Sequence, residues 1–288
     1  MYRSVPKKLE AEFRKRIIAF NESHAGKFRW KEYLAEAVDW RGRRVGALLG
    51  FVHWNWMYGA ALWVDRRQRE RGVGTRLLAA AEAAAYRRGT RNAYLESASF
   101  QAPGFYRKAG YRTYGQVPGM PEGHTTFFFH KKLRTGADRM HPGTGTLKIR
   151  LRTGTPKIPK PAVRWVGRRL GSFITRKIGS AAAKGFALES RDDEGALTAV
   201  CLGFDAWDWL HLDGLWVSGE RRGKGLGSRL LQLAEREAKR RGCRGVMLRA
   251  FGFQSPGFWK KRGYKVFGTL RGLPKGSNCR YFMKKWKA

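Results

Sequence analysis

The sequence predicts two copies of one α/β domain, and three observations lead to this. Residues 62–78 read as a strand, a glycine-rich turn and a helix, and residues 215–231 repeat the pattern. Corresponding residues lie 153 positions apart, which is the separation of Gly72 and Gly225, without a gap between residues 50 and 132 of the first copy. A repeat much longer than the ~20–50 residues of solenoid units indicates a duplicated domain. The length of 288 residues suits two domains of ordinary size.

The glycine-rich turn is the part of each copy with the clearest chemical meaning. Gly72 and Gly74 lack a Cβ atom, so a ligand can approach the backbone closely. The helix that follows begins with N–H groups that have no partner within the helix and with the positive end of the helix dipole. These features predict an anion site that suits phosphate. A tight strand-to-helix turn without a ligand remains the alternative, because the spacing alone does not separate the two.

The apolar pattern predicts the same order of elements in both halves. Leu9, Phe13, Ile17 and Phe20 alternate with charged residues at helical spacing, which predicts an amphipathic first helix. The elements expected in the first half are a helix at 6–20, strands at 31–39, 45–53 and 55–64, a helix at 72–88, a strand at 92–99, a short helix at 103–108, and strands at 112–117 and 125–132. Those expected in the second half are strands at 184–190, from 197 and from 209, a helix at 225–241, a strand at 245–250, a short helix at 256–261, and closing strands up to 287.

Composition limits the class of protein. Hydrophobic residues make up 42% and aromatic residues 13% of the chain, enough for packed cores. The sequence has no signal-peptide pattern and no apolar run of ~18 residues, so we expect a protein without a transmembrane segment. The three cysteines are an odd number without metal-ligand spacing. We therefore expect no disulfide framework, no metal site and a cytoplasmic location.

The charge of the chain is strongly positive. The sequence holds 59 Lys and Arg against 22 Asp and Glu, a net charge of +37. Such a charge predicts affinity for polyanions such as RNA or a ribosome, with a general surface bias as the alternative. Residues 134–180 concentrate it, with twelve cations and one acid. Gly/Pro-rich residues 134–162 read as a linker, and 163–178 as a basic helix that we expect to pack on the sheet of the second domain.

The order of elements and two motifs together resemble the GNAT superfamily of acyl-CoA N-acyltransferases. The motifs are Arg69-x-x-Gly72-x-Gly74, repeated as Arg222-x-x-Gly225-x-Gly227, and the aromatic segment from Phe100 that ends at Gly110-Tyr111. The resemblance implies two tandem domains, each a twisted, mostly antiparallel and splayed sheet flanked by helices. It implies acyl-CoA held between the fourth and fifth strands. The domains are then 1–133, expected to be catalytic, and 163–288, expected to be degenerate.

The resemblance also implies roles for individual residues. Backbone groups near Val64 would pair with the pantetheine arm and polarise the thioester carbonyl, as an oxyanion donor does. Tyr106 matches the family's proton donor to the coenzyme A thiolate, with half-buried packing as its alternative. Glu96 is the best-placed base for the substrate ammonium; His53 is a weaker candidate, for which a structural role is favoured. The residues expected to bind the cofactor are Trp63, Val64, Arg69, Arg71, Gly72, Val73, Gly74 and Thr75, with Arg222, Gly225, Gly227 and Ser228 in the second copy.

The copies differ where the chemistry is expected. Trp259 replaces Tyr106 and Arg249 replaces Glu96, whereas the glycine turn is kept. We therefore expect the second copy to be inactive, although it retains a turn that suits a CoA-type ligand. Two functions follow from the sequence. The first is an acetyl-CoA-dependent N-acetyltransferase that acts on a primary amine through its first domain. The alternative is a non-enzymatic RNA- or ribosome-binding protein built on two such folds.

Overall fold

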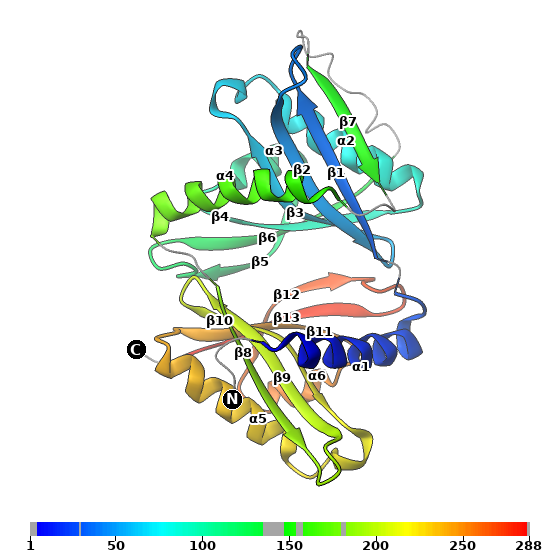
Figure 1. Ribbon diagram of the computed structural model, residues 1–288, viewed down its shortest axis with the longest axis vertical. Helices are drawn as coiled ribbons and strands as arrows, with labels where there is room; N and C mark the ends of the chain where they lie inside the picture. The colour runs from blue at the N-terminus through cyan, green and yellow to red at the C-terminus, as the bar shows by residue number, and fades with distance from the viewer. Residues whose placement is uncertain (1–4, 29, 135–146, 154–157, 180–182, 287–288) are drawn as a thin grey trace. The chain divides into compact units, whose positions relative to one another are not determined.

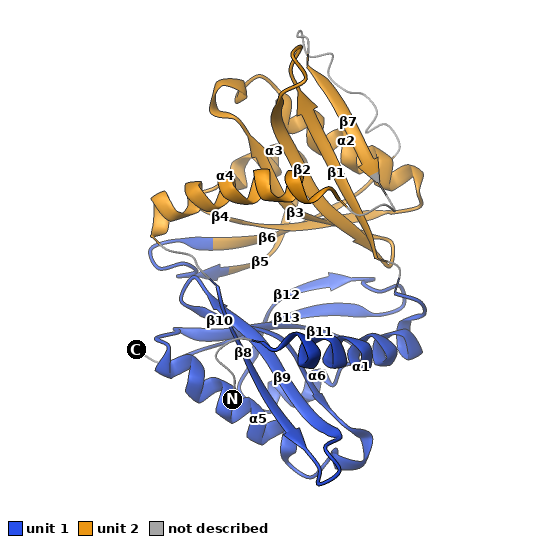
Figure 2. Cartoon of the chain, in the orientation of Figure 1, with its two compact units in different colours: residues 1–28, 117–125, 181–288 blue, residues 29–116, 126–180 orange. Residues whose placement is uncertain are grey.

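The computed structural model describes residues 5–28, 30–134, 147–153, 158–179 and 183–286. Its chain divides into two compact units (Figure 2). Unit 1 comprises residues 1–28, 117–125 and 181–288, and unit 2 comprises residues 29–116 and 126–180. Each unit contains one mixed, mostly antiparallel sheet with helices beside it, which confirms the predicted fold class.

The sheet of unit 2 has the strand order β5-β6-β4-β3-β2-β1-β7 (Figure 1). Strands β3 and β4 are parallel, whereas β1 pairs with β2 and β7, and β4 with β6, in antiparallel fashion. The strands are β1 Lys31–Val38, β2 Arg44–His53, β3 Trp56–Val64, β4 Asn92–Ala98, β5 Arg112–Pro118, β6 Thr125–Lys132 and β7 Lys148–Thr153. The helices are η1 Arg66–Gln68, α2 Val73–Arg87, α3 Pro103–Lys108 and α4 Lys160–Ile178.

The sheet of unit 1 repeats this arrangement in the order β12-β13-β11-β10-β9-β8. Its strands are β8 Lys184–Arg191, β9 Leu197–Ala206, β10 Trp209–Val217, β11 Gly245–Phe251, β12 Lys265–Arg271 and β13 Asn278–Lys285. Its helices are α1 Lys7–Ala25, η2 Gly219–Arg221, α5 Leu226–Arg240 and α6 Pro256–Lys260. The helices α2 and α5 bury equivalent apolar residues on the two sheets, such as Leu77 and Leu230, which the repeat relates.

The two copies exchange their first helices. Helix α1 precedes the strands of the first copy, but its Leu9 and Phe13 are buried against Val200 and Leu202 of β9 in unit 1. Helix α4 precedes the strands of the second copy, but it packs on β2 and β3 of unit 2. There its Ala162 and Val166 join the residues Leu34, Ala47 and Leu49. Each sheet is therefore covered on one face by a helix that belongs, in sequence, to the other copy.

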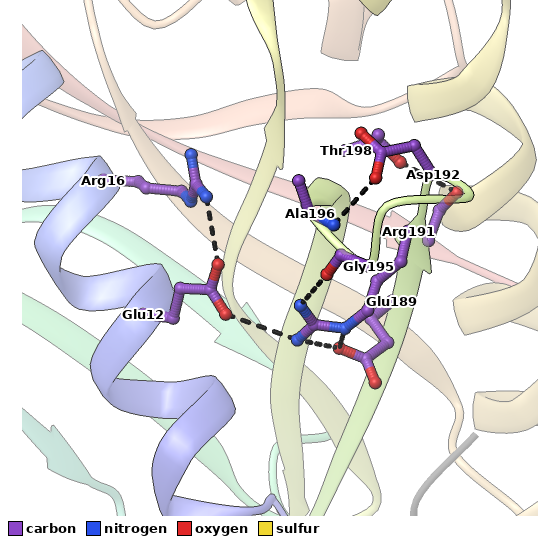
Figure 3. Close-up of polar contacts among 9 residues, drawn as sticks. Glu12, Arg16, Glu189, Arg191, Asp192, Gly195, Ala196 and Thr198 are labelled. Atoms are coloured by element: carbon purple, nitrogen blue, oxygen red, sulfur yellow. Dashed lines mark hydrogen bonds and ion pairs between the residues drawn. The ribbon is translucent and has the colours of Figure 1, made fainter.

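Polar contacts hold α1 in unit 1 as well (Figure 3). The Glu12 carboxylate accepts hydrogen bonds from Arg16 at 3.0 Å and from Arg191 of β8 at 3.3 Å. Arg191 also donates to Glu189 at 2.8 Å, and these arginines lower the pKa of Glu12 through their hydrogen bonds and charge. The helix is thus tied to a strand far from it in sequence.

This exchange differs from the expected domain boundaries of 1–133, 134–162 and 163–288. The helix expected at 163–178 lies in unit 2, and the expected linker contains strand β7, which pairs with β1. Ile149 and Leu151 pack on the core of unit 2 and alternate along β7 with Lys148, Arg150 and Arg152. Such a two-residue period is typical of a strand. Residues 135–146 and 154–157 of that linker lie outside the described residues.

In the described part of the chain, the helices are too short or too polar to cross a membrane.

The helix exchange leads to a prediction about stability. Phe13 is 5% exposed and fills the space beside Gly214, where a Cβ atom would lie 2.3 Å from its ring. Phe13→Ala should therefore remove about 3–5 kcal/mol of stability from unit 1. The matched variant Val166→Ala, which the repeat relates to Phe13, should destabilise unit 2 instead. Hydrogen exchange resolved by peptide should show lost protection in β8–β10 for Phe13→Ala and in β1–β3 for Val166→Ala; the reverse pattern would contradict the exchange.

Candidate active sites

In both sheets, two parallel strands pair along only half of their length. The pairing of β3 with β4 ends at Gly59 and Leu95, and that of β10 with β11 ends at Leu212 and Leu248. Beyond these points, the β4-facing backbone edge of β3 has no strand partner among the described residues. Such an edge offers N–H and C=O groups to an extended ligand. This opening is the splay that the sequence resemblance implied.

A bulge marks the start of each opening. The register between β2 and β3 shifts so that Ala60 is the extra residue of β3, and the register between β9 and β10 shifts at Asp213. An extra residue bends a strand and redirects the neighbouring side chains. The bulges occupy equivalent positions in the repeat, so the two openings are built in the same way.

The glycine turn has the conformation that an anion site needs. Gly72 lies just before α2 with φ of +73°, and Gly225 lies just before α5 with φ of +80°, in the left-handed region that glycine favours. No side chain caps either helix in the described structure. The first amides of α2, which include Val73, Gly74 and Thr75, have no acceptor inside the helix. They can therefore donate to an anion at this end of the helix.

Gly74 holds the turn close to its neighbours. A Cβ atom on Gly74 would lie 3.5 Å from the Phe105 ring and 3.7 Å from Val64, and one on Gly227 would lie 3.4 Å from Val217. The end of β3, the start of α2 and the short helix α3 therefore meet at Gly74. Arg71 and Thr75 are exposed beside it, and Val73 is buried in the core.

The arginine that opens each motif fastens the turn to the strand before it. Arg69 Nε donates to the Val64 carbonyl at 3.0 Å, and its guanidinium lies over the Trp63 ring at 4.8 Å. Arg222 Nε donates to the Val217 carbonyl at 3.1 Å in the same way. In the second copy, Ser228 accepts a hydrogen bond from Arg262. The hydrogen bonds of Arg69 and Arg222 therefore stabilise the conformation of the turn.

The predicted catalytic residues lie on consecutive elements of unit 2. Glu96 is exposed on β4 and is the first residue after the last pair with β3. Tyr106 lies on α3. The centroid of its ring lies 5.9 Å from that of Tyr111 and 6.0 Å from that of Phe129. Burial raises the pKa of Tyr106 to about 12, so its hydroxyl keeps its proton at neutral pH. Such a group can donate a proton but not accept one.

His53 has a structural setting. Its side chain is buried, and Nε2 lies 2.8 Å from the Tyr94 hydroxyl. The rings of Phe51 and Trp54 lie beside it at 5.5 and 5.7 Å. This environment fits the structural role that the sequence favoured for His53.

A charge network, buried around Glu82 and partly buried around Glu235, repeats in both units and holds α2 and α5 in place. Glu82 of α2 accepts a hydrogen bond from Tyr111 at 2.9 Å and from Lys131 of β6 at 2.6 Å. Glu235 of α5 meets Tyr264 and Lys284 in the same way, at 2.9 Å from each. The Gly-Tyr motif thus supplies the hydroxyl that ties the helix after the glycine turn to the far end of the sheet.

Unit 1 contains a cavity of about 430 Å³ at its glycine turn. Residues of the turn, of the parted strands β10 and β11, and of α6 line it, and so do Ile17 and Phe20 of α1. Asp213 and Arg249 also line it, and Trp259, which replaces Tyr106, forms part of the wall. The second copy has therefore kept a ligand-sized space, although the sequence predicted a degenerate site there.

Two parts of these sites were not predicted from the sequence. One is Asp213, because its counterpart in the first copy is the apolar residue Ala60. The other is the exchanged helix: Phe173 of α4 lies 6.0 Å from the Trp63 ring, and Phe20 of α1 lies 6.3 Å from the Phe253 ring. The sequence does indicate that the two helices are equivalent, since residues 7–25 align with 160–178 at the same separation of 153.

Comparisons with known proteins agree with this description. The model of the acetyltransferase (GNAT) domain matches residues 30–113, and that of the acetyltransferase (GNAT) family matches residues 165–264. Blasticidin-S acetyltransferase of Streptomyces morookaense is 41% identical over 102 residues, which are 35% of this chain and 75% of that protein. An acetyltransferase of Agrobacterium fabrum is 26% identical over 117 residues, 41% of this chain and 85% of that protein.

Among solved structures, an acetyltransferase from Bacillus cereus is 28% identical, with a TM-score of 0.43 over 45% of this chain and 95% of that one. The two family models and the similarity to the Streptomyces protein place the chain in the GNAT family of acetyltransferases, as a tandem of two GNAT domains.

The geometry of the turn predicts opposite tolerances for its two glycines. Gly72→Ala forces a side chain into the left-handed region and should cost about 1–2 kcal/mol of stability. Gly74→Ala should be neutral or slightly stabilising, because the new Cβ fits and alanine favours the helix. Urea unfolding of both variants checks this. Equal losses for both, or a larger loss for Gly74→Ala, would contradict the described turn.

Proposed function

We propose that the protein is an acetyl-CoA-dependent N-acetyltransferase that acetylates a primary amine in unit 2. The observation that carries the proposal is the parting of β3 and β4 next to an uncapped helix end at Gly72, in a chain of the GNAT family. The unpaired edge of β3 is followed along the chain by an anion site at the start of α2. This arrangement suits a ligand with a pantetheine arm and a pyrophosphate.

The residues of unit 2 fit acetyl-CoA. The amides between Arg71 and Thr75 would hold the pyrophosphate, and the edge of β3 at Trp63 and Val64 would pair with the pantetheine arm. Acetyl-CoA supplies an activated acetyl group when it is bound. A backbone N–H near Val64 would stabilise negative charge on the carbonyl oxygen as the amine nitrogen attacks.

Two side chains would handle the protons. Glu96, at the mouth of the opening, would take a proton from the substrate ammonium, directly or through a water. Tyr106 would return a proton to the thiolate of coenzyme A, and its hydroxyl carries that proton at neutral pH. The chemistry is direct transfer to the amine, without an acetylated enzyme.

The relative from Streptomyces suggests the first acceptor to test. Its name gives blasticidin S as the molecule that it acetylates. We therefore place blasticidin S first in a panel of primary amines for this protein.

The anion site predicts how acetyl-CoA binding responds to charge at Gly74. Gly74→Asp introduces a carboxylate that faces the pyrophosphate, and binding to unit 2 should fall by at least about 100-fold through repulsion and bulk. Gly74→Ala adds only the Cβ that the site accommodates, and serves as the control. Isothermal titration calorimetry measures both. Unchanged affinity of the aspartate variant would show that acetyl-CoA binds elsewhere.

The proton donor predicts a difference between the copies. Tyr106→Phe keeps the ring and removes the proton, so turnover should fall by about 10²–10⁴-fold. Trp259→Phe, at the equivalent position of unit 1, should leave turnover of the unit 2 substrate nearly intact. Steady-state kinetics with acetyl-CoA and an accepted amine measures both. Full activity of the Tyr106 variant would exclude Tyr106 as the donor.

A second candidate function, RNA binding, is favoured by one observation. Helix α4 packs its apolar face on unit 2 and exposes a row of cations to solvent, namely Lys160, Arg164, Arg168, Arg176 and Lys177. Together with the net charge of +37, this row suits a polyanion. Arg169 is different, because it pairs with Asp65 at 3.3 Å and lies over the Trp165 ring at 4.0 Å.

This candidate predicts the salt dependence of RNA binding. Replacement of Arg164, Arg168 and Arg176 by Gln should reduce the log–log salt slope on single-stranded RNA by roughly 2, at about 0.7 per lost phosphate contact. Acetyl-CoA binding should not change. Fluorescence anisotropy from low to high salt measures the slope. An unchanged slope would exclude α4 as the RNA-binding surface, and no binding at physiological salt would exclude this function.

A further inference from the structure

The opening of unit 1 contains a carboxylate, but on the other strand. In unit 2, the first residues beyond the last pair of β3 and β4 are Ala60 and Glu96, so the carboxylate lies on β4. In unit 1, the equivalent residues beyond the last pair of β10 and β11 are Asp213 and Arg249, so the carboxylate lies on β10. A comparison of single positions predicts an inactive copy, because Arg249 replaces Glu96. The opening nevertheless keeps an acid where the strands part.

Asp213 and the glycine turn belong to one cavity. The space of about 430 Å³ in unit 1 is lined by Asp213 at the parted strands and by Gly225 and Gly227 at the start of α5. Asp213 is the one acid among the described residues that line it. Ile17 and Phe20 of the exchanged helix α1 form part of the wall. The anion site and the carboxylate therefore border one space, which a cofactor and a second substrate can share.

The cavity is rich in arginine. Its lining includes Arg221, Arg222, Arg249 and Arg262. Arg222 donates to the Val217 carbonyl, and Arg262 donates to Ser228, so both stabilise the wall at the turn. Guanidinium groups and the uncapped amides of α5 together suit a ligand with several phosphate groups, such as acetyl-CoA.

The setting of Asp213 suits a base. Its side chain is accessible to solvent at the bulge of β10. The cavity walls limit hydration of the carboxylate and raise its pKa, and the charge of Arg249 opposes this. Glu10 and Arg14 of α1, which pair with each other at 3.5 Å, influence the pKa in opposite directions. A carboxylate with a raised pKa is a stronger proton acceptor.

We propose that unit 1 is a second N-acetyltransferase site, in which Asp213 is the base that deprotonates the substrate amine. The proposal rests on the chemistry proposed for unit 2, but it concerns a separate site with its own turn and its own carboxylate. It gives the chain two active sites whose bases lie on different strands of the opening. It also places α1, which comes from the other copy in sequence, beside the amine of unit 1.

The reaction balances without a tyrosine. Asp213 accepts one proton from the substrate ammonium, and the nitrogen attacks the carbonyl carbon of acetyl-CoA. The C–N bond forms, and the C–S bond breaks to release coenzyme A as a thiolate. The nitrogen loses its second proton, which reaches the thiolate directly or through water. Trp259 has no proton to donate, and none is needed, because a thiol with a pKa of about 8.5 leaves readily as its thiolate.

The test assigns each accepted amine to one unit. Acetyl-CoA is supplied with blasticidin S, monoamines, diamines, amino acids and short peptides, and release of coenzyme A is measured. Gly74→Asp places a carboxylate in the turn of unit 2, and Gly227→Asp does so in unit 1, where the Cβ has room. At least one amine should be acetylated by the Gly74→Asp variant but not by the Gly227→Asp variant. If no amine behaves in this way, the proposal is wrong.

Failure of the function proposed for unit 2 gives a different result. In that case no amine is lost in the Gly74→Asp variant, whereas the amines of unit 1 still require an intact Gly227. The two proposals can therefore fail independently.

Variants of Asp213 test its role as the base. With an amine assigned to unit 1, Asp213→Asn should lower kcat/KM by about 10²–10⁴-fold, as loss of a general base does. Isothermal titration calorimetry should still show one acetyl-CoA bound per unit, because the turn is unchanged. The matched control Asp193→Asn makes the same change on an exposed residue between β8 and β9, and should leave kcat/KM unchanged.

Three results would exclude Asp213 as the base. They are full turnover by the Asp213→Asn variant, an equal loss in the Asp193→Asn variant, and loss of acetyl-CoA binding to unit 1 in the Asp213→Asn variant. The last of these would indicate a structural role for Asp213.

Discussion

The parting of two parallel strands is the constraint on which the rest of each unit depends. Where β3 leaves β4 after Gly59, and β10 leaves β11 after Leu212, the backbone loses a neighbour and gains an edge that a ligand can use. The bulges at Ala60 and Asp213 set the place of this change. The glycine turn, the uncapped helix and the short helix with Tyr106 or Trp259 all lie around the opening. The GNAT fold thus concentrates its ligand-binding groups where regular sheet pairing stops.

The repeat allows two equivalent sites to be compared within one chain. The same backbone carries Ala60 and Glu96 in one unit and Asp213 and Arg249 in the other, so the two openings differ in charge but not in construction. The structural parts are kept in both copies: the left-handed glycines, the arginine that fastens the turn, and the Glu-Tyr-Lys network. The two units thus share one scaffold and differ in the charge of the side chains at the opening.

The exchange of α1 and α4 links the copies in sequence and in structure. Each unit needs a helix from the other copy to cover one face of its sheet, because Leu9 and Phe13 in one case, and Ala162 and Val166 in the other, fill the apolar surface there. The same helices bring Phe20 and Phe173 to the two openings. Loss of one helix would therefore affect both the packing and the ligand pocket of the unit that it covers.

The sequence by itself determined the elements, the duplication and the turn, because these depend on local periodicity, on glycine and on a separation of 153 residues that can be read directly. Apart from β7, which lies in the expected linker, the strands and the α-helices lie within a few residues of their predicted bounds, and the predicted family is confirmed. Only the tertiary structure decided which sheet each first helix covers, since both sheets offer an equivalent apolar face and local patterns cannot choose between them. It also decided that Asp213 and Arg249 line one pocket, because the pairing of β10 with β11 brings together segments that lie far apart in the sequence.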